Sequence, residues 1–509
     1  MAVVGRGIRS VSRASPRSSE IASLTSCAVL VAALGAAGQE SGPAARRERP
    51  ELPGTAEYAQ LCAGCHGPGL TGGSASSLVD RRWLYGGDNE SILASIRDGR
   101  PDTAMIPFRD LLSDEQIEQL LFLIRFNEAF VQYRPPPPMD PAGALVESEK
   151  LRFRLEMVAR DISTPWGIAF LPGGRLLISE RPGRLSVVSP GSPQPVPVSG
   201  TPVPWTVQDG GFFDVELHPD HAENGWVYLA YAAPGAQNTS TTEREGGNTS
   251  MTRIVRGRIR GGAWVDEEAL YEPPPELFGP ENVHYGCRFA FDADGNLLYS
   301  IGDRGVKERA QNLGSPLGKV HRIRADGGIP ADNPFVDTEG AVPTIWTYGH
   351  RNPQGFSFDP ATGLLWEAEH GPVGGDELNV LEPGRNYGWA ETSHGLEPGV
   401  GREPREGMEP AVVHWTPAIA PSAIHFYSGD RYPSWDGSLF VTGLGGTALR
   451  RLEVEGRRVL HEEVVFDSFG RVREVATGPD GFLYVTVETP GPRLSSPTDG
   501  FVVRLIPEE

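Results

Sequence analysis

The hydrophobic and polar positions of this chain follow two different patterns. In the first, apolar residues recur three and four positions apart, which predicts an amphipathic helix. Its apolar face consists of Ile117, Leu120, Leu121 and Ile124. Ser113 and Gln116 have the spacing of a capping box, so the helix is expected to begin there. In the second pattern, from about residue 151, short apolar runs are bracketed by Gly, Pro, Asp or Asn, which predicts β-strands joined by turns.

The β-type pattern repeats along the chain. Copies of strand, turn and strand follow one another about six times, at intervals of roughly 45–75 residues. They lie near residues 166–178, 212–230, 288–299, 355–366, 437–441 and 475–485. These repeats predict an all-β six-bladed propeller over residues 151–509, with an irregular pair of β-sandwiches as the alternative. Because the loops of a propeller converge on its central channel, functional residues are expected between the blades.

Composition supports a turn-rich fold and argues against one class of partner. The 509 residues include 63 Gly and 46 Pro, and this length suits two or three domains. The formal net charge is −20, and the lysines are Lys150, Lys307 and Lys319. Since the sequence has no basic patch to neutralise phosphates, nucleic acid is not expected as a partner.

The beginning of the chain looks like an export signal. Its basic residues are Arg6, Arg9, Arg13 and Arg17. A short apolar run at 27–37 follows, with small residues suited to cleavage at 36–38. We therefore expect a signal peptide over 1–38, a flexible leader over 39–51, and a periplasmic or otherwise exported protein. The run is too short to span a bilayer comfortably, so membrane association is expected only if this segment stays uncleaved or is lipidated.

Cys62-Ala63-Gly64-Cys65-His66 is the attachment pattern of c-type haem. Thiols at this spacing form thioethers with the haem vinyl groups, and the His that follows becomes the proximal iron ligand. Elimination among the methionines leaves Met105 as the second iron ligand, with a core-filling Met as the alternative reading. The motif, the Met105 loop and the helix after it resemble a small class I cytochrome c, over about residues 52–131.

This resemblance implies a small all-α cytochrome c domain over residues 52–133 that transfers single electrons. Arg134-Pro135-Pro136-Pro137-Pro138 then opens a Pro-rich linker over residues 134–150. A polyproline segment is a semi-rigid spacer, so it would hold the haem near a second redox site without fixing the geometry.

The loops between the predicted strands carry polar strings. They are GDRG at 302–305, TYGHRNPQG at 347–355, EHGPVGGDELN at 369–379 and NYGW at 386–389. In these strings and their order, the chain from Trp166 onward resembles the soluble PQQ-dependent aldose sugar dehydrogenases, a six-bladed propeller family. With the cytochrome-like segment in front, it is similar to fused quinohaemoprotein sugar dehydrogenases.

The resemblance implies that a reducing sugar is oxidised at its C1 hydroxyl to a lactone, with PQQ, Ca²⁺ and covalent haem c as cofactors. Electrons would pass singly through the haem to an external acceptor, such as a periplasmic cytochrome or a respiratory-chain component. His284 matches the catalytic base, Asp303 the acid that orients it, and Arg351 a group that stabilises negative charge on the quinone. The residues that match cofactor contacts are Gln208, Arg351, Asn352, Arg471 and Arg473.

Metal ligands and a pocket wall are implied in the same way. Gly371 and Pro372 match carbonyl ligands of a Ca²⁺ that also binds PQQ. Glu377 and Tyr387 match a second Ca²⁺ site, and Trp415 is expected to wall the substrate pocket.

The chain also departs from the pattern. Some relatives place a Lys near 444–446, where this chain has Leu-Gly-Gly, so that contact is missing or made by Arg450. Cys287, close to the expected base, is interpreted as a small buried hydrophobe. Two other functions remain open from the sequence: a Ca²⁺ lactonase-type hydrolase, and a binding propeller that has lost PQQ. Retention of His284, Asp303 and Arg351 argues against the second.

Overall fold

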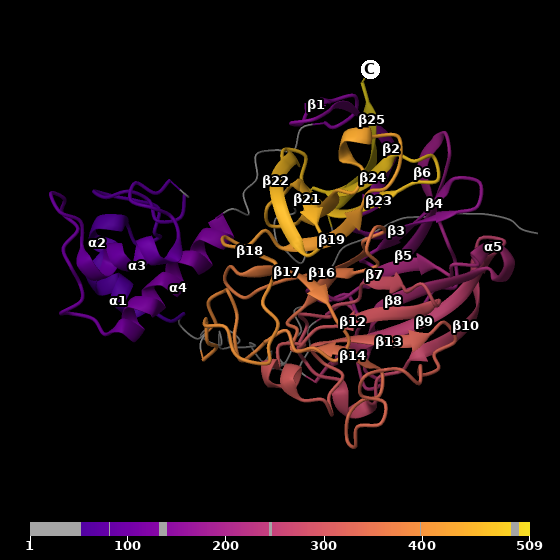
Figure 1. Ribbon diagram of the computed structural model, residues 1–509, viewed down its shortest axis with the longest axis horizontal. Helices are drawn as coiled ribbons and strands as arrows, with labels where there is room; N and C mark the ends of the chain where they lie inside the picture. Colours follow the sequence, from indigo (N-terminus) through magenta and orange to yellow (C-terminus); the bar gives the residue numbers. More distant parts are fainter. Residues whose placement is uncertain are drawn as a thin grey trace, which may run out of the picture. The chain divides into compact units, whose positions relative to one another are not determined.

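The computed structural model describes residues 52–80, 82–131, 140–243, 247–397, 399–489 and 498–508. The expected signal peptide at 1–38, the leader at 39–51 and the polyproline run at 134–138 lie outside these ranges. The described chain consists of a helical part followed by a part built almost entirely of strands (Figure 1). Within the described ranges, no helix is long and apolar enough to cross a membrane.

Short and long helices form the first part. They are α1 (Thr55–Glu57), the π-helix η1 (Tyr58–Cys62), α2 (Ala63–His66), α3 (Asn89–Asp98) and α4 (Asp114–Val131). The predicted capping box is present: the Ser113 amide donates to Gln116 Oε1 at 3.0 Å, and the Gln116 amide donates to Ser113 Oγ at 3.2 Å. The two bonds satisfy backbone donors that a helix start leaves unpaired, so α4 begins where the sequence predicts.

The predicted apolar face of α4 is the centre of the helical core. Ile117, Leu120, Leu121 and Ile124 are each at most 4% exposed. They pack with Tyr58 of η1 and with the apolar side of α3. The core is therefore held by burial of one helix face, the usual source of stability for helices of this length.

Six antiparallel sheets form the second part. Blade 1 contains β3 (Pro165–Leu171), β4 (Arg175–Glu180), β5 (Arg184–Ser189) and β6 (Ser192–Pro197). Blade 2 contains β7 (Phe212–Leu217), β8 (Trp226–Pro234), β9 (Ser250–Arg260) and β10 (Ala263–Tyr271). Blade 3 contains β11 (Phe289–Phe291), β12 (Asn296–Ile301), β13 (Lys319–Arg324) and β14 (Ile345–Tyr348). In Figure 1 the four strands of blade 2 lie side by side in sequence order.

The remaining blades have the same order of strands. Blade 4 contains β15 (Pro353–Phe358), β16 (Leu365–Glu369), β17 (Asp376–Leu381) and β18 (Val413–Trp415). Blade 5 contains β19 (Pro421–Phe426), β20 (Leu439–Gly443), β21 (Leu449–Glu455) and β22 (Arg458–Phe466). Blade 6 contains β23 (Arg471–Thr477), β24 (Leu483–Glu488), β25 (Asp499–Pro507), β2 (Arg152–Ser163) and β1 (Leu145–Glu147). Short helices in the loops are α5 (His221–Asn224), η2 (Pro275–Leu277), η3 (Lys307–Gln311) and η4 (Pro433–Trp435).

Contacts between first strands close the six sheets into a ring. β3 contacts β7, β7 contacts β11, and the series continues through β15, β19 and β23 back to β3. Blade 6 joins the two ends of the domain, since β2 pairs with β25 from the end of the chain. The structure thus confirms the predicted fold class, a small α domain followed by a six-bladed propeller, and excludes the β-sandwich alternative.

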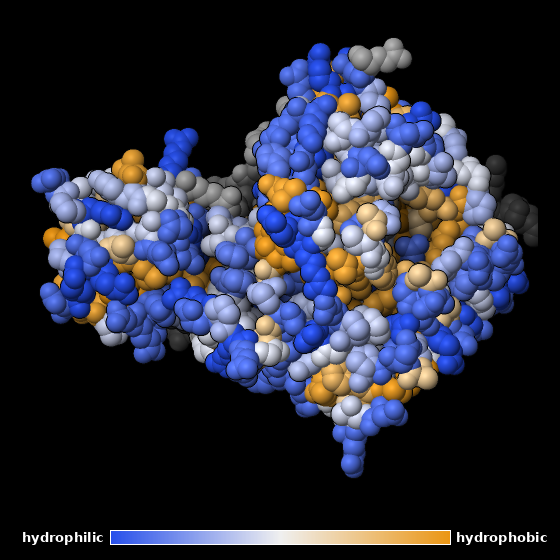
Figure 2. Space-filling model, viewed as in Figure 1, coloured by the Kyte–Doolittle hydropathy of each residue, from blue (hydrophilic) through white to orange (hydrophobic). Residues whose placement is uncertain are grey.

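Strand β1 lies inside the stretch that the sequence assigns to the linker. Leu145 pairs with Arg154 and Glu147 with Arg152, so the segment extends the sheet of blade 6. The viewed surface is largely hydrophilic, with smaller hydrophobic patches (Figure 2), as the abundance of charged residues leads one to expect.

A buried arginine ties several blades together at the channel. Arg288, just before β11, contacts Asp214 of β7 at 3.2 Å and also pairs with Glu474 of β23. Its Nε donates to the Gln354 carbonyl at 2.8 Å, and its guanidinium lies 4.5 Å from the Trp166 ring centre. One buried charge thereby joins blade 3 to blades 1, 2, 4 and 6, and its removal would leave two buried carboxylates unpaired.

Candidate functional site

The haem-attachment motif lies on the turn from η1 into α2. Cys62 is half-buried and Cys65 is exposed. Burial, followed by the nearby Cys65, raises the pKa of the Cys62 thiol to about 11. His66 Nδ1 lies 2.8 Å from the Ser76 carbonyl oxygen. Because a carbonyl only accepts, Nδ1 carries the proton and Nε2 keeps its lone pair for a metal.

Met105 lies in the loop between α3 and α4. Its carbonyl accepts a hydrogen bond from the Arg100 amide at 2.8 Å, and its half-buried side chain packs against the helical core. Leu84, Tyr85 and Ile106 of the same part are 79%, 51% and 55% exposed. A group of large, exposed apolar side chains is the kind of surface that an apolar ligand such as haem would cover.

His284 occupies the loop before β11 and has a positive φ of 52°. Its Nδ1 lies 2.7 Å from Asp303 Oδ1, while 19% of its side chain stays exposed. A Cβ on Gly302 would lie 2.4 Å from the His284 carbonyl oxygen, so only glycine lets the Asp303 loop approach this closely. The imidazole is therefore fixed at one nitrogen, and Nε2 is left for a ligand.

Asp303 is held from both sides. Its Oδ1 also accepts from the Gly305 amide at 2.8 Å, and its Oδ2 accepts from Trp389 Nε1 at 2.7 Å. Burial by itself would raise the pKa of Asp303, but the hydrogen bond and charge of His284, together with Arg351, bring it below its ordinary value. Asp303 is thus a buried anion that sets the orientation of the imidazole.

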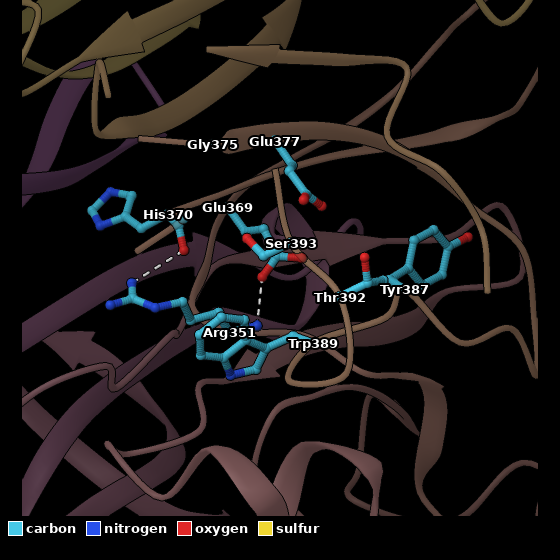
Figure 3. A pocket seen from close by; sticks show the side chains of 10 residues that line it. Arg351, Glu369, His370, Gly375, Glu377, Tyr387, Trp389, Thr392 and Ser393 are labelled. Atoms are coloured by element: carbon cyan, nitrogen blue, oxygen red, sulfur yellow. Dashed lines mark hydrogen bonds between the residues drawn. The ribbon is translucent and has the colours of Figure 1, made fainter. Parts of the chain in front are cut away.

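Arg351 and Asn352 lie between the His284 loop and blade 4. The Arg351 amide donates to Glu369 Oε2 at 2.6 Å, and its Nη1 donates to the His370 carbonyl at 3.2 Å (Figure 3). Its Nε is buried without a hydrogen-bond partner in the described chain. Asn352 Oδ1 accepts from the Gly286 amide at 3.1 Å, which leaves its NH₂ group to donate elsewhere.

Arg471 and Arg473 on β23 share one acidic partner. Glu488 Oε1 lies 2.8 Å from Arg471 Nε and 3.3 Å from Arg473 Nη2. Burial lowers the pKa of Arg473 to about 10. The charges of both arginines outweigh burial at Glu488 and lower its pKa to about 2. Glu488 thus holds two guanidinium groups side by side, and such groups suit a ligand with carboxylates.

The Gly371–Pro372 loop is shaped by a buried acid. Asp376 accepts hydrogen bonds from the amides of Gly371, Ile419 and Ala420 at 2.9, 2.7 and 2.6 Å. Burial raises the pKa of Asp376 to about 6. Since this side chain bonds the Gly371 amide, the backbone carbonyls of the loop stay available as ligands.

Glu377 and Tyr387 line the small recess shown in Figure 3. Burial, followed by the nearby Glu369, raises the pKa of Glu377. The Tyr387 hydroxyl points away from Glu377 in Figure 3; it accepts from the Glu382 amide and donates to the Val380 carbonyl, both at 2.8 Å. Only the backbone of Tyr387 is therefore free to bind a cation beside Glu377.

The remaining residues singled out from the sequence are Trp415, Arg450, Gln208 and Cys287. Trp415 is 7% exposed in the core that β18 shares with blade 5, and its Nε1 points to Glu462. Its ring therefore lies in the core and is not among the residues that line the recess of Figure 3. Arg450, which lies on the third strand of blade 5, also pairs with Glu462. The backbone carbonyl of Gln208 accepts a hydrogen bond from Arg181 Nη1 at 2.7 Å. Cys287 is fully buried, as expected from the sequence.

Sequence reasoning missed the residues that hold these groups in place. They are Glu369, Asp376, Trp389 and Glu488. The first three lie inside the polar strings quoted above, and this position is the signal that could have found them. Glu488 lies at the end of an apolar strand, and its pairing with two arginines depends on the fold.

Two family models match the chain. One describes glucose / sorbosone dehydrogenase and covers residues 162–495; the other describes cytochrome C oxidase, cbb3-type, subunit III, and covers residues 50–121. Fold and site together define a propeller dehydrogenase joined to a c-type cytochrome domain. The chain belongs to the glucose/sorbosone dehydrogenase family, whose model matches more than half of its length.

Individual relatives agree with this assignment. An uncharacterised protein of Synechocystis, slr1608, is 37% identical over 68% of this chain and 86% of its own. The aldose sugar dehydrogenase YliI of Escherichia coli is 34% identical over 66% of this chain and 90% of its own. A solved structure titled glucose dehydrogenase is 36% identical, covers 69% of this chain and 98% of its own, and superposes with a TM-score of 0.63. The helical part resembles cytochrome c55X of Stutzerimonas stutzeri, 39% identical over 12% of this chain and 54% of the relative.

Proposed function

We propose that this chain is an exported, PQQ-dependent dehydrogenase that oxidises the C1 hydroxyl of an aldose to the lactone and delivers the electrons to its own haem. The observation that carries the proposal is the His284–Asp303 pair, which fixes a base beside buried arginines. A base needs a partner that holds its tautomer and stabilises the charge it gains, and Asp303 does both at 2.7 Å.

His284 Nε2 takes the proton from the sugar hydroxyl. The positive charge that forms on the imidazole is stabilised by Asp303, which stays an anion because its pKa is lowered. When bound, PQQ supplies the quinone carbonyl that accepts the hydride leaving C1. Arg351 is placed to stabilise negative charge there, since its guanidinium is held against the His370 carbonyl and 5.4 Å from the Trp389 ring centre.

The residues present fit a tricarboxylate cofactor. Buried Nε atoms of Arg351 and Arg473 have no partner in the described chain, and a buried guanidinium nitrogen calls for an acceptor. These residues, with Gln208, Asn352 and Arg471, would hold PQQ. Carboxylate–guanidinium pairs of this kind are strong because both partners are charged.

The carbonyls of Gly371 and Pro372 would hold Ca²⁺, which supplies Lewis-acid polarisation of the quinone. Glu377 and the Tyr387 backbone would hold a second Ca²⁺. Burial raises the pKa of Glu377, so the recess has an acid that a cation would stabilise in its charged form. In the helical part, Cys62 and Cys65 would attach the haem, with His66 and Met105 as iron ligands; a Met–His pair leaves no open position and suits electron transfer.

The test is the visible spectrum of haem-loaded protein, reconstituted anaerobically with PQQ and Ca²⁺, before and after a panel of aldoses. We expect one or more sugars to reduce the haem α-band only when PQQ is present. Dithionite supplies the fully reduced reference. If no sugar reduces a haem that dithionite reduces, although PQQ is bound, the proposed sugar oxidation is wrong.

A further inference from the structure

Asp209 lies at the site but has no role in the function described so far. It belongs to the turn before β7, in which the Gly210 amide donates to the Val207 carbonyl at 3.1 Å and Gln208 has a φ of 57°. The Asp209 amide donates to the carbonyl of Asn282 at 3.1 Å, two residues before His284. The turn is therefore attached directly to the loop that carries the base.

The carboxylate of Asp209 is accessible and surrounded by cations. The residue is exposed, while enough protein surrounds its carboxyl group that burial raises its pKa. The groups that oppose this rise are His284 first, then Arg181, Arg304 and Arg473. In the described chain, no hydrogen bond or ion pair ends on the Asp209 carboxylate, so its oxygens are available to a ligand.

Among the described residues, the hydrogen-bond partners of the neighbouring Arg304 are neutral. Arg304 donates to the carbonyls of Val283 and Glu281, and its guanidinium lies 3.6 Å from the Tyr285 ring centre. Carbonyls satisfy its N–H groups without cancelling its charge. Asp209 thus supplies a negative charge near His284 and Arg304.

We propose that Asp209 is a specificity-determining residue, whose carboxylate accepts hydrogen bonds from the hydroxyls of a neutral sugar beside His284 and repels sugars that carry a carboxylate. The inference rests on the proposed sugar oxidation. Two acceptor oxygens suit a pair of sugar hydroxyls, whereas a carboxylate on the sugar would bring like charges together. Without Asp209, the remaining arginines would favour the anionic sugar.

The test compares a neutral sugar with its uronic acid. Asp209→Asn keeps the shape and removes the charge; Asp209→Glu keeps the charge. Asp294→Asn, in the exposed turn at the far end of β11, is a matched control for the same change of charge. For each holoenzyme, kcat/KM is measured with glucose and glucuronate, and with galactose and galacturonate. We expect the uronate-to-aldose ratio to rise at least about tenfold in Asp209→Asn and to stay near the wild-type value in the other two variants.

A binding measurement separates this inference from the proposed function. Methyl glucoside and methyl glucuronide lack a free anomeric hydroxyl, so they bind without being oxidised, and calorimetry on the same holoenzymes gives their Kd values. If Asp209→Asn shifts the Kd ratio toward the glucuronide while no aldose is oxidised, the selectivity stands and the proposed reaction fails. If aldoses are oxidised and neither ratio changes, or if neither glycoside binds any variant, Asp209 does not select the substrate. Circular dichroism shows whether Asp209→Asn is folded. If it is not, the proposal requires Asp209→Glu to keep the wild-type uronate-to-aldose ratio, and a raised ratio in that variant would contradict it.

Discussion

The helical part and the propeller place their chemistry in opposite ways. Cys62, Cys65 and His66 lie within a single turn of chain between η1 and α2. The groups around His284 instead come from loops and strands of blades 2, 3, 4 and 6. They are more than 250 residues apart at their extremes, from Asp209 to Glu488. A local motif needs only a helix turn to form, whereas the second site exists only when the ring of blades is closed.

The difference extends to electrostatics. In the helical part, one backbone carbonyl, that of Ser76, sets the tautomer of His66. In the propeller, Asp303, Glu369 and Glu488 are buried carboxylates, each paired with a base, a backbone amide or an arginine from another segment. Buried charges of this kind cost free energy unless their partners are in place, so the propeller site is coupled to the stability of the whole ring.

The largest expected effect is on haem attachment, which depends on one short segment of the chain. A Cys62→Ala/Cys65→Ala double variant removes both thiols, so we expect complete loss of haem that survives denaturing electrophoresis, measured by haem staining. Cys287→Ala is the matched control, because that thiol is fully buried in the propeller. Haem that stays covalently bound in the double variant would contradict the attachment site.

The next effect tests the assembled site. His284→Ala removes the proposed base, and we expect kcat with an artificial acceptor to fall roughly 10²–10⁴-fold, the usual contribution of a general base. PQQ titration should show that the cofactor still binds. His461→Ala, on the exposed outer strand β22, is the control. Normal turnover in His284→Ala would remove His284 as the base.

A smaller effect is expected on the free energy of unfolding, because the ion pairs of Glu488 depend on pH. The pKa of Glu488 falls from its ordinary 4.5 to about 2 in the folded protein. Its contribution to stability is therefore fully present above pH 4.5 and is lost as the pH falls toward 2; it amounts to about 3 kcal/mol. We expect Glu488→Gln to lower the free energy of unfolding by about this much at pH 7, and the difference from wild type to shrink between pH 5 and pH 3.

Urea denaturation at several pH values measures the Glu488 effect. Glu156 pairs with Arg504 on the outside of blade 6, where its side chain is 50% exposed. Glu156→Gln is thus the exposed counterpart and should cost less than about 1 kcal/mol. If the two variants lowered the free energy of unfolding equally, the buried pair would have no special role.

The contrast between local and long-range contacts also explains which features the sequence predicts. The start of α4 and its apolar face depend on residues three and four positions apart, and both were predicted correctly. Most of the repeats were predicted because the first two strands of a blade and their turn lie close together in the sequence, as in β3 (Pro165–Leu171) and β4 (Arg175–Glu180). Strand β1 was not predicted, because Leu145–Glu147 is too short to show alternation and gains its order by pairing with β2.

The candidate site was predictable as a set of loops and not as a set of contacts. The pairing of His284 with Asp303 was expected from a family resemblance, whereas no spacing or pattern of residues predicts their 2.7 Å contact. Asp209 is adjacent to Gln208, the residue that the resemblance selected, yet the charged groups converge on Asp209. The turn that carries both residues has a φ of 57° at Gln208, a property of the folded turn that the sequence does not show.

The smallest expected effect concerns the helical part, where a local capping interaction is removed. Ser113→Ala removes one half of the capping box at α4, and we expect it to lower the stability of the helical part by about 1 kcal/mol. The Soret band of the haem, followed during urea denaturation, reports on this part alone. Ser74→Ala, at an exposed site in the same part, is the control and should change stability by less than about 0.5 kcal/mol. Because the cap is local, the propeller should unfold at the same urea concentration in both variants; a parallel shift of the propeller transition would show that the two parts do not unfold independently.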